Sequence, residues 1–195
     1  MRVNRRTVAI GVFVLVLIVL AGVSLCDGDG DGDGDGDGDE LDLADYPYAV
    51  QQIEAIEDRS HFPTGETYDG YNSDPPTSGP HADTFAPSGV SDPPVAREMA
   101  VHNMEHAGVV VWYNCEAEPA LDSDACAELR DQLSQVVLPE AADGRAVLMT
   151  SYSLMDTRIA LTAWGFLDTF EEFDEARVRA FISTFECNFD PENFC

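Results

Sequence analysis

An uncharged and mostly apolar run at positions 7–25 follows a short segment that contains three arginines, Arg2, Arg5 and Arg6, and no acidic residue. About 20 apolar residues are enough for a helix to cross the hydrocarbon core of a bilayer. Positive residues stay preferentially on the cytoplasmic side of such a helix. The sequence therefore predicts an N-terminal membrane or signal segment, residues 1–25, with the rest of the chain outside the cytoplasm.

Three fates of this segment fit its composition. It can be retained as a signal anchor, cleaved as a signal peptide, or processed as a lipoprotein signal at Cys26, which directly follows the apolar run. Lipoprotein processing requires a small residue before the cysteine, whereas Leu25 stands there in this chain. We therefore favour a retained transmembrane helix at the cell membrane, with lipoprotein processing and secretion as open alternatives.

A repeat of Asp and Gly at positions 27–40 separates the apolar run from the rest of the chain. Gly makes such a segment flexible, and repulsion between Asp carboxylates extends it. We interpret residues 26–45 as a flexible acidic linker. Residues 46–195 then form one extracytoplasmic domain, since about 150 residues are sufficient for a single hydrophobic core.

The charge of the chain limits its partners. The net charge is −27, no Lys occurs, and all ten basic residues are Arg. Such a field repels nucleic acid and anionic lipid headgroups, so both are excluded as partners. The expected contact with the membrane is through the N-terminal segment, and any protein partner in the cell envelope is unidentified.

Four cysteines lie in the predicted extracytoplasmic domain, where disulfides persist. They are Cys115, Cys126, Cys187 and Cys195. Of the three possible connectivities, the short loops favour pairing the first two with each other and the last two with each other. The alternative, a thiolate metal site, is disfavoured because no C-x-x-C spacing occurs.

The hydrophobic pattern predicts an α+β domain, with three helices packed on a short and mainly antiparallel sheet. Alternating or continuous apolar positions indicate the strands, and a period of 3.6 with capping residues indicates the helices. The strands are expected at residues 109–113, 146–150 and 158–166. The helices are expected from near Pro94 to Ala107 with Asp92 as cap, from a cap at Ser123, and from a cap at Asp174, with a short helix possible at residues 49–57.

The four histidines, His61, His81, His102 and His106, lie in one stretch of the domain. His102 and His106 are four residues apart on a predicted helix, which is the spacing of a chelating pair. His81 follows a stiff Pro-rich loop, and His61 is expected to complete the set. Three or four imidazoles suit zinc or copper. The alternatives are hydrogen-bonded structural histidines and proton transfer without a metal.

Residues 102–106 also read H-x-x-E-H. In zinc peptidases of the inverted type, the two histidines of this motif bind zinc and the glutamate is the general base. Glu105 would be that base here, although such enzymes need a further acidic ligand and a larger cleft. Glu98 and Glu105 can otherwise support the histidines as hydrogen-bond partners. A small zinc hydrolase and a metal-free envelope protein thus remain as alternative functions.

Several segments resemble the uncharacterised family catalogued as domain of unknown function 3105. They are His61 before a Gly-rich stretch, up to Gly65, then Tyr71 followed by Pro-Pro-Thr-Ser-Gly-Pro-His at residues 75–81, Val-His-Asn-Met-Glu-His at 101–106, and Leu-Thr-Ala-Trp-Gly at 161–165. The resemblance spans roughly residues 58–185. The chain departs from the family at Met104, where Leu is common, and at Ala107, where Gly is common.

This resemblance implies an N-terminally anchored extracytoplasmic domain of a prokaryote. It also implies that all four histidines occupy motif positions of the family. It carries no assigned activity.

Overall fold

The computed structural model describes Leu43 and residues 46–195. The predicted membrane segment, residues 1–25, lies outside the described residues, as does nearly all of the predicted linker. Among the helices that are described, none combines the length and the hydropathy needed to cross a membrane.

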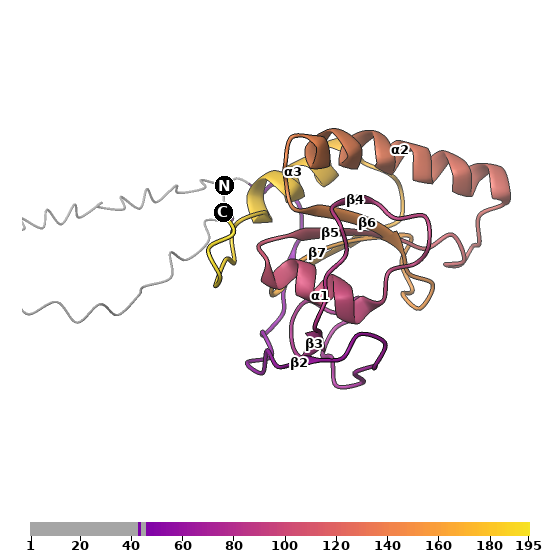
Figure 1. Cartoon of the computed structure of the whole chain (residues 1–195). Helices are drawn as coiled ribbons and strands as arrows, with labels where there is room; N and C mark the ends of the chain where they lie inside the picture. The colour runs from indigo at the N-terminus through magenta and orange to yellow at the C-terminus, as the bar shows by residue number, and fades with distance from the viewer. Residues whose placement is uncertain (1–42, 44–45) are drawn as a thin grey trace, which may run out of the picture. The chain divides into compact units, whose positions relative to one another are not determined.

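Residues 46–195 form an α+β domain with three helices, as predicted (Figure 1). The elements in chain order are β1 (Gln51–Gln52), β2 (His61–Phe62), β3 (His81–Ala82), β4 (Gly89–Val90), α1 (Arg97–Glu105), β5 (Val109–Tyr113), α2 (Ser123–Ala142), β6 (Val147–Ser151), β7 (Ile159–Ala163), β8 (Phe166–Phe170) and α3 (Glu175–Phe185).

Six of these strands form the main sheet, in the order β1-β8-β7-β5-β6-β4. The pairs β1–β8, β8–β7 and β7–β5 are antiparallel, whereas β5–β6 and β6–β4 are parallel. The prediction of a mainly antiparallel sheet is therefore confirmed. The remaining two strands, β2 and β3, pair in parallel as a separate small sheet.

Helices cover both faces of the main sheet (Figure 1). In β5, Val109 and Val111 pack in the cluster that contains the apolar residues of α2 and α3. Val110 and Trp112 of the same strand pack on the other face, with the apolar residues of α1. Because both faces are covered, every residue of β5 is buried, which explains the continuous apolar run in its sequence.

The predicted strand at residues 158–166 is wrong in its extent, since the segment belongs to two strands, β7 and β8. The pairing of Ala163 with Phe166 leaves a two-residue turn between them. Gly165 occupies this turn with φ of 78°, a backbone conformation that Gly adopts without steric cost. The short helix considered at residues 49–57 is also wrong. Residues 51–52 form strand β1, which pairs with β8. The next residue, Ile53, donates from its N–H to Gly165 O over 2.8 Å.

The helix ends differ partly from the prediction. Helix α1 begins at Arg97, and Ala96 rather than Asp92 is its cap residue, without a side-chain hydrogen bond. Asp122, one residue before the predicted Ser123, caps α2. Asp174 caps α3, as predicted.

Helix α1 ends at Glu105, two residues before the predicted end. Gly108 follows the helix, and its N–H donates to Asn103 O over 3.0 Å. A Cβ atom at Gly108 would lie 2.5 Å from the same oxygen. The close packing of Gly108 on the last turn therefore explains why the chain turns away there into β5.

Both predicted disulfides are confirmed, Cys115–Cys126 and Cys187–Cys195. The thiols of these four cysteines are thus unavailable for a thiolate metal site.

Candidate metal centre

Three segments that are distant in sequence bring four side chains with metal-binding atoms together. His61 and His81 come from the paired strands β2 and β3, while His102 and Glu105 come from α1. One ligand atom from each of the four residues lies within 4.8 Å of the others. The group can therefore hold a metal ion through three imidazoles and one carboxylate.

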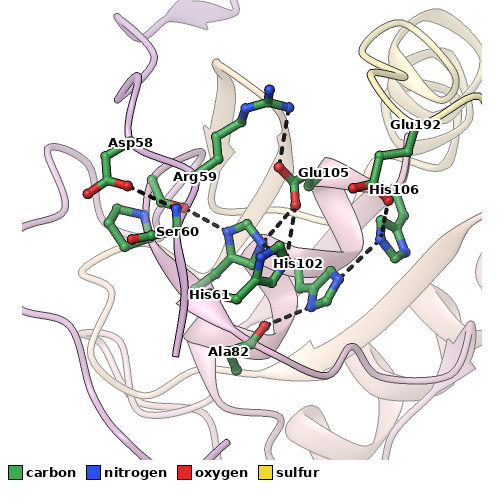
Figure 2. A network of polar contacts seen from close by, with 12 residues as sticks. Asp58, Arg59, Ser60, His61, Ala82, His102, Glu105, His106 and Glu192 are labelled. Carbon is green, nitrogen blue, oxygen red and sulfur yellow. Dashed lines mark hydrogen bonds and ion pairs between the residues drawn. The ribbon is translucent and has the colours of Figure 1, made fainter. Parts of the chain in front are cut away.

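The local structure explains why these side chains meet. In the parallel pairing of β2 and β3, His61 is the direct partner of His81, so the two side chains lie on the same face of the small sheet. His102 and Glu105 are three residues apart on α1, a spacing that places them on one helix face. Figure 2 shows the side chains of His61, His102 and Glu105 turned toward one another.

The distances within the group resemble those between ligands of one ion. Nε2 of His81 lies 3.0 Å from Nε2 of His61 and 2.9 Å from Oε2 of Glu105. Nε2 of His61 lies 3.4 Å from the same oxygen. Tetrahedral ligands at the usual zinc–nitrogen distance would lie about 3.3 Å from each other. These three side chains are thus already close to a coordinating arrangement, and a ligand atom of His102 lies within 4.8 Å of them.

Backbone carbonyls orient two of the imidazoles. His81 Nδ1 lies 2.8 Å from Gly79 O, and His102 Nδ1 lies 2.7 Å from Ala82 O. Because a carbonyl oxygen accepts but never donates, Nδ1 carries the proton in each neutral ring, and Nε2 presents its lone pair. Hydrogen bonds of this kind support metal-bound histidines in proteins.

The carboxylate of Glu105 is the unusual member of the group. Its side chain is 3% exposed, and Oε2 is buried without a hydrogen-bond donor aimed at it, despite its 2.9 Å distance from His81 Nε2. A buried carboxylate oxygen without a donor is costly. Two imidazole nitrogens lie within 3.4 Å of it without donating to it, so a positive charge at the centre of the group would give this oxygen a partner.

The charge state of His102 suits metal binding. Burial lowers the pKa of His102 below its ordinary value, and nearby His106, His81 and His61 lower it further, while the hydrogen bond to Ala82 acts in the opposite direction. A lowered pKa keeps the imidazole neutral at pH 7, and the neutral form is the metal ligand.

His106, the fourth predicted ligand, lies beside the group rather than within it. Its Nε2 is 3.1 Å from His102 Nε2 and 3.2 Å from Glu192 Oε2. Its ring stacks on Phe194 with a centroid distance of 4.0 Å. His106 is the C-cap residue of α1, and its N–H still donates to His102 O over 3.1 Å, so the two rings meet as the i, i+4 spacing predicts, although His106 lies outside the group of four.

Glu105 takes the position that the sequence reasoning gave to His106. The sequence pointed to Glu105 as a general base or as a hydrogen-bond partner of the ligands, and not as a ligand in its own right. The signal that could have identified it is the i, i+3 spacing from His102, which carries His and Glu ligands in helical metal sites.

The group is open to solvent on one side. His81, His102 and Glu105 are buried, whereas the side chain of His61 is 41% exposed. Arg59 lies on the exposed side as well, with Nη1 3.3 Å from Glu105 Oε1 (Figure 2). An ion bound here would therefore be reached from the side of His61 and Arg59.

Comparison with known proteins identifies a family. The family model described as "Protein of unknown function (DUF3105)" matches residues 61–194, a segment that includes all four residues of the group. No curated protein and no solved structure matches the chain. The match extends over most of the described domain, and the chain belongs to the DUF3105 family of proteins of unknown function.

Proposed function

We propose that this domain binds one transition-metal ion, zinc or copper, through His61, His81, His102 and Glu105. One observation carries the proposal: the buried Oε2 of Glu105, which has no hydrogen-bond donor, lies 2.9 Å from Nε2 of His81 and 3.4 Å from Nε2 of His61, within a group of four possible ligand atoms. A metal ion accepts electron density from all four atoms at once. It would thereby give the buried carboxylate oxygen the partner that it lacks.

A purely structural role for the histidines explains less. The hydrogen bonds from His81 and His102 to backbone carbonyls would satisfy Nδ1 in each ring. They would leave Glu105 Oε2 buried without a hydrogen-bond partner, although it lies only 2.9 Å from His81 Nε2. A proton on Nε2 of His81 would not satisfy this oxygen, because no N–H direction in the group is aligned with Glu105 Oε2.

Three imidazoles and a carboxylate suit both zinc and copper, since imidazole binds either ion well. With four protein ligands, zinc would be held in a closed tetrahedral site. Copper(II) prefers a tetragonal arrangement, which keeps further positions for an exchangeable ligand. Elemental analysis of the purified protein distinguishes the two ions directly.

We further propose that the domain acts outside the cytoplasm, attached to the cell membrane by residues 1–25. The uncharged run after three arginines supports this location. The two disulfides agree with it, because disulfides persist in oxidising compartments outside the cytoplasm.

The zinc hydrolase reading of H-x-x-E-H makes a different prediction for Glu105. A general base must not be a metal ligand, so Glu105→Gln would leave the metal content intact while abolishing hydrolysis. If Glu105 is a ligand, the same substitution lowers metal affinity. Measuring metal content in this one variant separates the two roles.

The decisive experiment measures zinc and copper per chain in the purified full-length protein, beside His81→Ala/His102→Ala and His106→Ala variants. We expect about one ion per chain in the parent and in His106→Ala, as for a mononuclear site. We expect none in the double variant, with circular dichroism showing that it remains folded. Absence of bound metal in the parent after loading with each ion would overturn the proposal.

A further inference from the structure

We propose that the metal centre takes a small oxyanion or carboxylate as an exchangeable ligand, and that Arg59 positions this anion. This inference rests on the proposed metal site and names the class of molecule that the site would bind. Four features of the structure support it: the open side of the group, the place of Arg59, its support by neighbouring residues, and the local charge.

The open side of the group is where an additional ligand would enter. His61 is the exposed member of the four, and the other three are buried. Copper(II) and five-coordinate zinc both accept a ligand beyond four protein atoms. Access from solvent would therefore be on the side of His61.

Arg59 stands on the same side, two residues before His61 in the sequence. Its Nη1 donates to Glu105 Oε1 over 3.3 Å, while Glu105 Oε2 faces the histidines. Within the described residues, the Arg59 side chain makes no other hydrogen bond. A guanidinium has five N–H donors in a planar fork that matches carboxylate and phosphate oxygens. Arg59 can therefore hold Glu105 and an incoming anion together.

The position of Arg59 is supported from two sides. Its guanidinium carbon lies 6.0 Å from the ring centroid of Phe189, at the limit of a cation–π contact. Phe189 in turn stacks on Trp164 with a centroid distance of 4.8 Å. The neighbouring acid, Asp58, accepts a hydrogen bond from Ser60 N over 2.9 Å instead of pairing with Arg59. Arg59 is thus held near the site, with Glu105 as its ion-pair partner among the described residues.

The local charge favours an anion even though the whole chain has a net charge of −27. A divalent ion bound by one carboxylate and neutral imidazoles retains a positive charge, and Arg59 adds another. Exposed acidic residues farther away than about 8 Å are screened at physiological ionic strength. Two nearer carboxylates, Asp58 and Asp83, are exposed and accept hydrogen bonds from Ser60 and Thr64, so the ion and Arg59 supply the attraction for an incoming anion.

The test uses the full-length protein loaded with copper(II), or with cobalt(II) in place of zinc, and titrated with azide and with acetate. Bound azide changes the visible absorption of either ion, and acetate is expected to compete with it. The variants are Arg59→Gln and Arg59→Lys. Arg179→Gln is a matched control, since Arg179 is 41% exposed and Arg59 44%, and Arg179 pairs with carboxylates on α2 and α3.

We expect azide to bind the parent and the Arg179→Gln control with the same affinity. We expect the same of acetate. We expect acetate to bind Arg59→Gln about tenfold more weakly, as for the loss of one charge-assisted hydrogen bond. Arg59→Lys should be intermediate, because it keeps the charge and loses the fork. Metal content is measured in every sample, so that affinities refer to the loaded protein.

Two results would overturn the inference while leaving the metal site intact: a metal-loaded parent whose spectrum no anion changes, or an Arg59→Gln variant that binds acetate as tightly as the parent. Failure of the parent to bind any metal would instead overturn the proposed function, and this inference with it.

Discussion

Nε2 of His102 lies 3.1 Å from Nε2 of His106, yet the two rings have different surroundings. His102 is held by Ala82 O and faces His61 and His81. His106 faces Glu192 and stacks on Phe194. Of the two rings, only His102 belongs to the group of ligand atoms that lie within 4.8 Å of one another, which separates a candidate ligand from its neighbour.

This separation predicts unequal effects of two alanine substitutions. In the proposed site, His102→Ala removes a ligand and should lower metal affinity by more than about 100-fold, beyond the loss typical of residues that only support a ligand. His106→Ala should lower it by at most about tenfold. Competition with a chelating dye measures both affinities. Equal losses in the two variants would mean that His106 is itself a ligand.

The lowered pKa of His102 predicts how the stability of the metal-free protein depends on pH. Its folded-state pKa lies below the ordinary value of 6.5, so the unfolded state binds more protons in the interval between the two values. The contribution of His102 to stability is therefore present above pH 6.5 and is lost as the pH falls through the folded-state pKa.

Urea unfolding at about pH 5 and about pH 7.5 checks this sign. The metal-free parent should be less stable at the lower pH, and His102→Gln should reduce the difference. If the stability of His102→Gln depends on pH as that of the parent does, His102 is not the cause of the dependence.

Tyr46 connects the start of the described domain to the sheet. It donates to Asp168, a buried carboxylate that also accepts from Arg177 Nε over 2.8 Å. Burial raises the pKa of Tyr46, and the hydrogen bond to Asp168 raises it further, so the hydroxyl keeps its proton. Tyr46→Phe should lower the free energy of unfolding by about 1–2 kcal/mol, because a hydrogen bond to a charged group is lost.

The neighbouring Tyr48 provides the control for this change. Its hydroxyl makes no hydrogen bond within the described residues, so Tyr48→Phe should alter stability by less than about 0.5 kcal/mol. Similar urea midpoints for the two variants would mean that the Tyr46–Asp168 contact contributes little.

The disulfide Cys115–Cys126 joins the segment after β5 to the first turn of α2, over a sequence separation of 11. Replacing both cysteines with serine should lower the free energy of unfolding by about 2–3 kcal/mol, through the entropy of the unfolded chain. Removal of Cys187–Cys195 should cost less, because this bridge closes a loop at the end of the described chain whose residues are mostly exposed. Thermal unfolding of the two double variants compares the losses of stability. A larger loss on removal of Cys187–Cys195 than of Cys115–Cys126 would refute this account.

Several features of the fold could be predicted because they depend on local sequence. The run at residues 109–113 and the apolar stripe of α3 each carry their own periodicity, and Asp174 caps α3 as its position in the sequence suggests. Both disulfides join cysteines close in sequence. By contrast, the predicted bounds of the strand at residues 158–166 were wrong, because the turn at Gly165 does not interrupt the apolar character of the segment. Strand β1 was missed because its two residues are exposed glutamines, held by pairing with β8.

The sequence by itself determined that imidazoles would gather near one helix and that their chemistry would suit a metal ion, since residue type and helical spacing are local properties. The tertiary structure decided which side chains form the group. The pairing of β2 with β3 sets His61 beside His81. Helix α1 turns His102 and Glu105 toward this pair, whereas Glu192 and Phe194, distant in sequence, contact the His106 ring beside the group. Both outcomes depend on contacts between residues far apart in sequence, and periodicity along one segment contains no information about them.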